Sequence, residues 1–170
     1  LEAARQLSQL SPKAEIHAVA TVQEEIGLRG ARTAAYGIDP DIGIAVDVTF
    51  ATDHPNMADA MKRENFIELG KGPVLTRGPN INPKLFDLLV KTAKAEKIPV
   101  QISAEPGGTG TDANALQLNR AGVVTGLVSI PLRYMHSPCE LISLKDLEQC
   151  ATLLAKTIEK VTARTNFVPF

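Results

Sequence analysis

Two runs of this sequence are apolar almost without interruption, and they constrain the fold more than any other feature. The first covers residues 42–50 and the second covers residues 123–130. A strand that is apolar on both faces is typical of the buried, parallel sheets of α/β proteins. One stretch between the two runs has helical spacing instead, and in it Asn82 and Pro83 predict the start of a helix over residues 83–96.

The order of the remaining elements predicts a layered α/β fold with a mostly parallel sheet. With 170 residues and no internal linker, the chain is expected to be one domain or a piece of one. The stretch 51–71 is expected to be irregular and to form the rim of a site. Further strands are expected over 16–22, 72–76 and 98–103, and helices over 1–10, 30–36, from 111 to about 120 and from Ser143.

The composition excludes several classes of partner. The 18 basic and 19 acidic residues give a net charge of −1 and form no block of like charge, so neither nucleic acid nor an anionic membrane is expected as the main partner. No apolar run approaches the roughly 20 residues of a membrane-spanning helix. The two cysteines, Cys139 and Cys150, predict reduced thiols and a cytoplasmic location. Because the sequence starts at Leu1 rather than at a methionine, its natural start is expected to lie elsewhere.

Two adjacent acids, Glu24 and Glu25, follow the expected strand over 16–22. Like charges this close repel each other and both lose water, so a bound cation or a proton held for catalysis is the usual compensation. Adjacent side chains leave the backbone in different directions, which favours a division of labour between one metal ligand and one general base. A solvated surface turn is the alternative interpretation of the same pair.

Two further polar side chains, Asp47 and His136, are expected at the same edge of the sheet. Asp47 lies near the end of an apolar strand, where a buried acid needs a partner, and His136 lies in a loop six residues after Ile130. Because sites in open α/β sheets form at the carboxyl ends of strands, these groups are expected to meet the two glutamates. Three carboxylates and one histidine suit Zn²⁺, Mn²⁺ or Co²⁺.

A glycine-rich loop over residues 105–111 leads into the helix that Thr111 or Asp112 caps. The loop lacks the phosphate-binding pattern Gly-x-x-x-x-Gly-Lys-Ser/Thr. It is either a tight turn into the helix or a helix start that faces a substrate carbonyl or carboxylate.

Several segments, taken together, resemble the M42 family of metallo-aminopeptidases, which includes glutamyl, deblocking and tetrahedral aminopeptidases. The resemblance runs in order from about residue 1 to residue 165. It implies a three-layer α/β/α sandwich of the zinc-peptidase type with a mixed, mostly parallel sheet. It also implies two divalent metal ions, zinc or cobalt, that share a bridging carboxylate. The segments are Thr-Val-Gln-Glu-Glu-Ile-Gly-Leu-Arg-Gly-Ala, Ala-Tyr-Gly-Ile-Asp-Pro-Asp, Ala-Val-Asp-Val-Thr, Gly-Thr-Asp-Ala-Asn-Ala and Ser-Ile-Pro-Leu-Arg-Tyr-Met-His-Ser-Pro-Cys-Glu.

The resemblance also implies roles for individual residues. Glu24 looks like the catalytic general base that activates the metal-bridging water for hydrolysis of N-terminal residues from a peptide substrate. Glu25 and His136 look like ligands of one metal, and Asp47 looks like a ligand of the other. Asp112, by analogy, faces the substrate cleft.

The sequence departs from the family pattern in what it lacks. The family has an upstream His-x-Asp motif, an Asp-Asp-Arg segment before the helix of residues 1–10, and a dimerisation domain between them; none is present here. We therefore expect residues 1–170 to be the C-terminal portion of an incomplete catalytic domain, inactive by itself, from a full-length protein that forms homo-oligomers.

Two other functions compete with this hypothesis. One is a glycoside hydrolase, since some M42 members have carried endoglucanase names. The 4% aromatic content and the lack of tryptophan disfavour sugar stacking. The other is a non-catalytic fragment that keeps the fold and half of a metal site.

Overall fold

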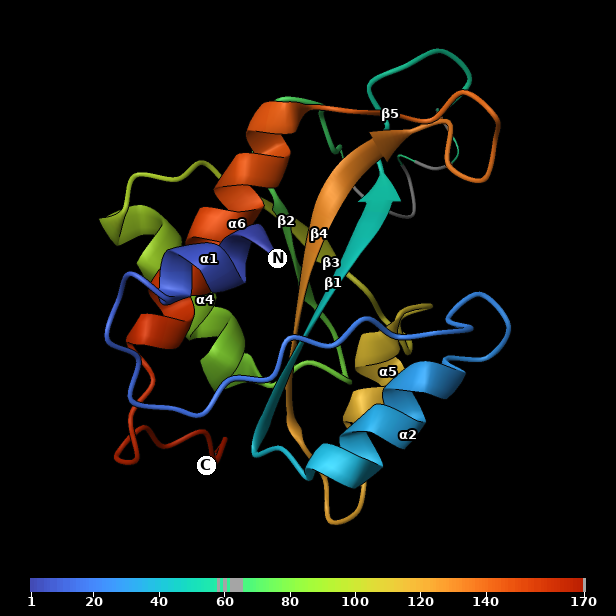
Figure 1. Ribbon diagram of the computed structural model, residues 1–170. Coiled ribbons are helices and arrows are strands. Elements are labelled where there is room, and N and C mark those ends of the chain that lie inside the picture. Colours follow the sequence, from blue (N-terminus) through green and yellow to red (C-terminus); the bar gives the residue numbers. More distant parts are fainter. Residues whose placement is uncertain (58, 60, 62–65, 170) are drawn as a thin grey trace.

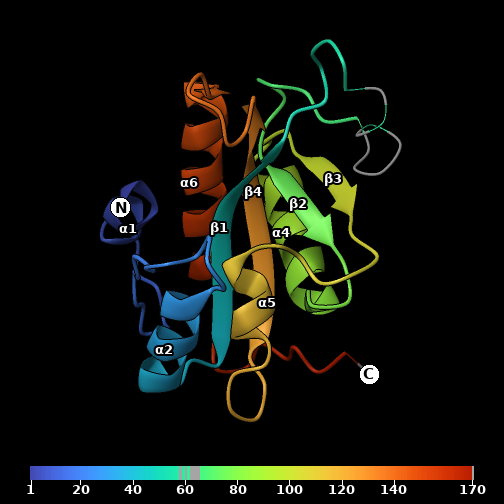
Figure 2. The ribbon, with the colours of Figure 1, turned by 90° about the vertical axis from the view of Figure 1, so that its right-hand side faces the viewer.

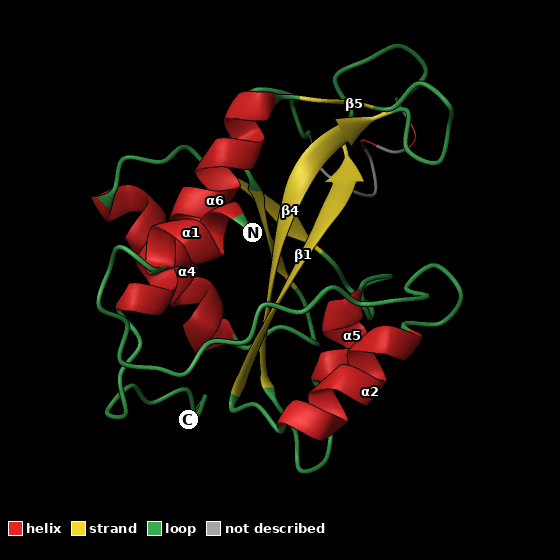
Figure 3. Cartoon of the chain, viewed as in Figure 1, coloured by secondary structure: helices red, strands yellow, loops and turns green. Residues whose placement is uncertain are grey.

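The chain folds around one open sheet that has helices on both faces. The computed structural model describes residues 1–57, 59, 61 and 66–169. In Figure 1, α1, α4 and α6 lie on one side of the sheet and α2 and α5 lie on the other. The turned view in Figure 2 shows β1 and β4 side by side behind α5. The elements, coloured by type in Figure 3, are α1 (Glu2–Leu7), α2 (Arg29–Ile38), β1 (Ile42–Phe50), β2 (Val74–Arg77), α4 (Pro83–Ala95), β3 (Gln101–Ala104), α5 (Asp112–Leu116), β4 (Val124–Arg133), β5 (Leu141–Ile142) and α6 (Leu144–Glu159).

The sheet is mixed, in agreement with the predicted fold class. Its strand order is β1-β4-β2-β3, and β5 pairs with the end of β4. β1 and β4 run parallel, with Asp47 opposite Ser129, and β2 and β3 are also parallel. β2 and β5 each pair with β4 in the antiparallel direction. Because β1 and β4 are parallel neighbours, their carboxyl ends and the loops that follow lie at the same end of the sheet.

The core is centred on β4 rather than on β1. Residues 125–132 of β4 are all buried, and Val128 packs with Leu75, Leu89 and Leu153, each 0% exposed. The long apolar run of β4 is therefore explained by burial on both faces. β1 is less covered than its sequence predicts, since Val46 is 52% exposed. Within the described residues β1 forms an edge of the sheet, so one of its sides lacks a neighbouring strand.

The strand predicted over 16–22 is absent, and this prediction was wrong for the structure. The segment runs extended beside β1, but the described residues form no ladder with it, and Val19 and Val22 are 48% and 65% exposed. A cavity of about 270 Å³ lies between this segment and β1. The segment lines it with Glu15, His17, Val19 and Thr21, and β1 lines it with residues 42–46. An apolar, β-type sequence forms a strand only where a backbone partner is available.

Other boundaries follow local chemistry with small shifts. The Asn82 side chain accepts hydrogen bonds from the N–H groups of Lys84 and Leu85, so α4 begins where the sequence predicts. Ser143 caps α6 in the same way. α5 is shorter than predicted, β3 begins later, and α2 continues through Gly37. Of the predicted irregular stretch over 51–71, residues 58, 60 and 62–65 lie outside the described residues. Among the helices that the structure describes, none is both long and apolar enough to cross a membrane.

Candidate functional site

The turn that carries Glu24 and Glu25 is closed by backbone hydrogen bonds. The Glu24 carbonyl accepts from the Gly27 and Leu28 N–H groups at 3.1 and 2.9 Å, and the Gly30 N–H donates to the Val22 carbonyl at 2.8 Å. A Cβ atom at Gly30 would lie 2.3 Å from the Val22 nitrogen, so only glycine permits this close approach. The two acids are therefore presented on a tight turn immediately before α2.

Glu25 meets His136, as the sequence hypothesis requires. Glu25 Oε1 lies 3.3 Å from His136 Nε2, and the two side chains are 73% and 66% exposed. Figure 1 shows the turn before α2 and the loop after β4 on the same side of the molecule. His136 follows the end of β4 by only three residues, because that strand continues to Arg133. The Glu140 carboxylate accepts a hydrogen bond from the His136 backbone N–H at 2.7 Å, which helps to fix the loop.

Asp47 and Glu24 lie close enough to this pair to affect each other's ionisation. Asp47 is half-buried on β1, and one of its oxygens accepts from the Val48 N–H at 2.7 Å. Burial raises the pKa of Asp47, and the charges of Asp112 and Glu25 raise it further, while His136 lowers it. Burial also raises the pKa of Glu24, and Asp47, Glu25 and Asp112 add to the rise. The site is thus a group of carboxylates with a shortage of positive charge.

A bound divalent metal fixes the distance between its ligand atoms. Two ligands bound tetrahedrally to zinc at about 2.1 Å lie about 3.4 Å apart, and Glu25 and His136 are separated by 3.3 Å. In the described part of the chain, however, no group of three His, Cys, Asp or Glu residues is arranged to hold a metal ion. The residues present therefore fit one ligand pair of a metal site and not a complete coordination shell. The assignment of Glu24, Glu25, Asp47 and His136 to individual roles stays a prediction.

An ion pair that the sequence reasoning missed supports the loop that carries His136. Arg133 donates to Asp53 from Nε at 2.9 Å and from Nη2 at 2.7 Å, and the second Asp53 oxygen also accepts from the Leu69 N–H. The ring of His54 lies against that of Tyr134 at 4.8 Å between centroids. These contacts tie the ends of β1 and β4 together. Arg133 stands inside a recognised motif, but no local signal links it to a residue 80 positions away.

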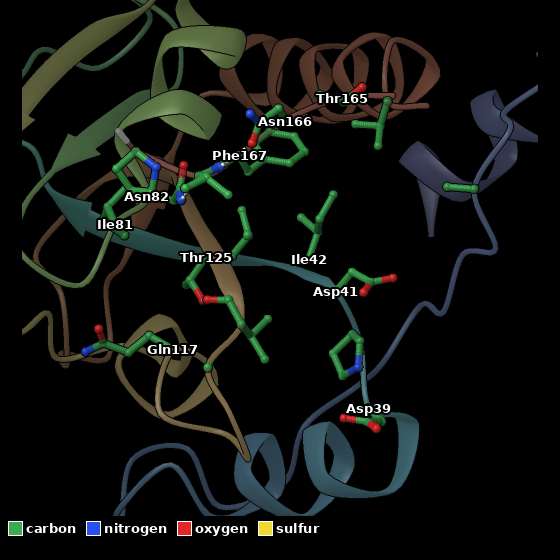
Figure 4. Close-up of a pocket in the computed structure, with 18 of the residues that line it drawn as sticks. Asp39, Asp41, Ile42, Ile81, Asn82, Gln117, Thr125, Thr165, Asn166 and Phe167 are labelled. Atoms are coloured by element: carbon green, nitrogen blue, oxygen red, sulfur yellow. Dashed lines mark hydrogen bonds between the residues drawn. The ribbon is translucent and has the colours of Figure 1, made fainter. Parts of the chain in front are cut away.

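A larger cavity, of about 1110 Å³, lies at the opposite end of the sheet (Figure 4). It is lined by residues that precede β1 and β4 and by the C-terminal segment, including Asp39, Asp41, Asn82 and Phe167. Two of its polar side chains already have structural partners, since Asn82 caps α4 and donates to the Phe167 carbonyl, and Asp39 pairs with Arg120. The carboxylates whose pKa values are raised, Glu24 and Asp47, lie instead beside Glu25 and His136.

The family model described as M42 glutamyl aminopeptidase matches residues 1–153. The chain belongs to the M42 family. The predicted resemblance to this family and the predicted α/β fold are thereby confirmed, since solved M42-type aminopeptidases share the same arrangement.

This M42 chain is similar to a lysyl aminopeptidase and to two TET peptidases of known structure. A lysyl aminopeptidase from Pyrococcus furiosus is 51% identical over 95% of this chain and 44% of its own length. The TET aminopeptidase of Thaumarchaeota archaeon SCGC AB-539-E09 has a TM-score of 0.86 and 35% identity, covering 95% of this chain and 45% of that one. The TET1 peptidase of Pyrococcus horikoshii, which can assemble into a tetrahedron or a large octahedral shell, has a TM-score of 0.64 and 29% identity over 83% and 40% of the two chains. The chain thus spans less than half the length of these relatives.

Proposed function

We propose that this chain is the C-terminal portion of the catalytic domain of a metal-dependent aminopeptidase, which removes N-terminal residues from peptides. The observation that carries the proposal is the meeting of Glu25 with His136 at 3.3 Å, beside Glu24 and Asp47, at the carboxyl end of β1 and β4. Membership of the M42 family and the likeness to a lysyl aminopeptidase support the reaction class.

Each side chain of the site has a proposed role that follows from its position. Glu25 and His136 would hold one divalent ion, zinc or cobalt, and Asp47 would hold a second. Bound metal supplies an acidified water and a polarised peptide carbonyl. Glu24 would accept a proton from the attacking water at its carboxylate and then donate it to the leaving amine. Burial raises the pKa of Glu24, which makes the carboxylate a stronger base than an ordinary surface glutamate.

We further propose that the full site needs residues from outside this chain. The described residues offer one ligand pair, and the relatives are more than twice as long. The cavity between residues 15–21 and β1 lies beside an unpaired edge of the sheet, where an additional strand could pair on both sides.

Metal removal tests the reaction class. A longer polypeptide that includes this chain, freed of metal with a chelator, should lose hydrolysis of aminoacyl-4-nitroanilides and regain it when Zn²⁺ or Co²⁺ is added. A glycoside hydrolase needs two carboxyls and no metal, so it would keep its activity after chelation. Retained peptidase activity after complete metal removal would also contradict the proposal.

The isolated chain tests completeness. Residues 1–170 alone should show no peptidase turnover, while the longer polypeptide turns over the same substrates. Comparable turnover by both would overturn the claim that the site is incomplete, and no turnover by either would favour the non-catalytic alternative. Substrates with N-terminal lysine, glutamate and leucine would reveal the preferred residue.

The assembly and location are proposed from the relatives and the thiols. The named assemblies of the Pyrococcus horikoshii peptidase suggest that the complete protein forms homo-oligomers. Cys139 and Cys150 are both free thiols, as a reducing cytoplasm would maintain. Burial raises the pKa of Cys150 to about 12, so this thiol is expected to be inert.

A further inference from the structure

Asp112, the first residue of α5, has a hydrogen-bond partner that is unusual for an acid at the start of a helix. An acid in the first turn of a helix ordinarily satisfies the free N–H groups of that turn. Here its Oδ2 atom instead accepts a hydrogen bond of 2.6 Å from the hydroxyl of Thr21, 91 residues away in sequence. Its Oδ1 atom is buried and has no hydrogen-bond partner among the described residues. A buried carboxylate oxygen without a partner costs stability, so the stability of α5 alone does not explain the placement of Asp112.

Thr21 lies at a point where the chain has little other support. The segment 15–22 forms no ladder with β1 in the described part of the structure, and Val22 is 65% exposed. Downstream, the turn is closed against α2 by the Gly30–Val22 hydrogen bond. Upstream, the Thr21–Asp112 hydrogen bond is the contact that ties this segment to α5. Asp112 therefore adds a side-chain hydrogen bond from α5 to the backbone hydrogen bonds that close the turn presenting Glu24 and Glu25.

Asp112 also lies close enough to Glu24 and Asp47 to affect their ionisation. Its charge raises the pKa of both Glu24 and Asp47. Asp112 and Thr21 line the same end of the cavity beside β1. The hydrogen bond thus lies next to the side chains whose directions matter for catalysis.

We propose that Asp112 is a positioning residue of the aminopeptidase site, which acts through Thr21 to fix the turn that presents Glu24 and Glu25. The expected effect on catalysis rests on the proposed function. The effect of the Thr21–Asp112 hydrogen bond on the turn does not depend on it. Because a ligand pair must keep its spacing, loss of this hydrogen bond should let Glu25 drift from His136 and reduce both metal affinity and turnover.

Four substitutions separate the hydrogen bond from size and charge. Thr21→Val keeps the side-chain shape and removes the donor, whereas Thr21→Ser keeps the donor. Asp112→Ala removes the acceptor, whereas Asp112→Asn keeps an acceptor oxygen and removes the charge. Asp87→Ala, which removes an exposed acid on α4, is the matched control.

Hydrogen exchange of the 170-residue chain tests whether the Thr21–Asp112 hydrogen bond stabilises the turn, and it does not require an active enzyme. Thr21→Val and Asp112→Ala should each speed exchange of the Gly27, Leu28 and Gly30 amides about tenfold or more. Thr21→Ser, Asp112→Asn and the control should leave exchange near wild type. Unchanged exchange in both Thr21→Val and Asp112→Ala would overturn the proposal, whatever the outcome for peptidase activity.

Kinetics of the longer polypeptide test the consequence. Thr21→Val and Asp112→Ala should each lower kcat and the affinity for Co²⁺ about 10- to 100-fold, with little change in KM. The double variant should be no worse than either single variant, because both remove one contact. A large loss in Asp112→Ala with none in Thr21→Val, or a rise confined to KM, would show that Asp112 binds substrate or metal directly and would refute the positioning role.

Discussion

Asp53 and Asp146 differ from Glu24 and Asp47 in what surrounds their charges. Asp146 is fully buried, and its two oxygens accept from the N–H groups of Gly70 and Gly72 at 2.7 and 2.9 Å. The Arg133 guanidinium holds the pKa of Asp53 below its ordinary value. The pKa values of Glu24 and Asp47 are instead raised by burial and by neighbouring acids.

The difference separates acids that stabilise the fold from acids that we propose to take part in the candidate site. The chain supplies donors for the first group, so their charges stabilise the fold. It supplies too few for the second group, and such perturbed carboxylates are typical of functional sites. The comparison predicts opposite responses when a charge is removed from each group.

The largest expected effect is on turnover, for Glu24→Gln. Glutamine has nearly the same size but cannot accept the proton, so kcat of the active, longer polypeptide should fall about 10²- to 10⁴-fold. Metal content, measured per polypeptide by mass spectrometry, should remain at the wild-type level. Glu25→Ala is the comparison, because it should lose metal as well as rate. Near wild-type turnover in Glu24→Gln would mean that another group is the base.

The next effect is on folding, for Asp146→Ala. The substitution leaves the buried N–H groups of Gly70 and Gly72 without acceptors, so the free energy of unfolding should fall by about 3 kcal/mol. Asp87→Ala, on the exposed face of α4, should stay within about 0.5 kcal/mol of wild type. Urea denaturation of the 170-residue chain measures both. Equal midpoints for the two variants would remove Asp146 from the structural group.

Local sequence signals predicted what depends on local chemistry. The apolar run over 42–50 gave the bounds of β1, and Asn82 and Ser143 gave the starts of α4 and α6, because a cap acts on the next few residues. The state of residues 16–22 depends instead on a neighbouring backbone, which their own side chains do not encode.

The candidate site also combines residues that the sequence predicted with contacts that it did not. Glu24, Glu25, Asp47 and His136 could be chosen because the topology brings strand ends together and the motifs resemble a known family. The contacts Thr21–Asp112 and Asp53–Arg133 join residues 91 and 80 positions apart, and no pattern in one sequence pairs such distant residues.

A smaller effect is expected for Asp53→Asn. Since the pKa of Asp53 is lowered in the folded state, its ionised form adds stability above the unfolded-state value of about 3.9, and this is lost as the pH falls through the folded-state value. The variant should therefore be about 1 kcal/mol less stable than wild type at pH 7. The gap should narrow below about pH 4 and close as the pH falls below the folded-state pKa. Thermal unfolding between pH 3 and pH 7 tests this, and a gap that is constant with pH would point to packing rather than charge.

The smallest expected effect has the opposite sign, for Asp47→Asn without metal. A carboxyl whose pKa is raised by folding costs stability when it is ionised, so this cost is absent below the unfolded-state pKa and present above the folded-state pKa. Asparagine keeps an oxygen for the Val48 N–H and carries no charge. The variant should therefore be more stable than wild type at pH 7, by less than about 1 kcal/mol, and equal to it below about pH 4. Unfolding curves at both pH values measure the difference, and Asp87→Asn controls for net charge. A loss of stability at pH 7 would mean that the charge of Asp47 stabilises the fold, as the charges of Asp53 and Asp146 do. The contrast between the two groups of acids would then not hold for Asp47, the residue proposed to bind metal.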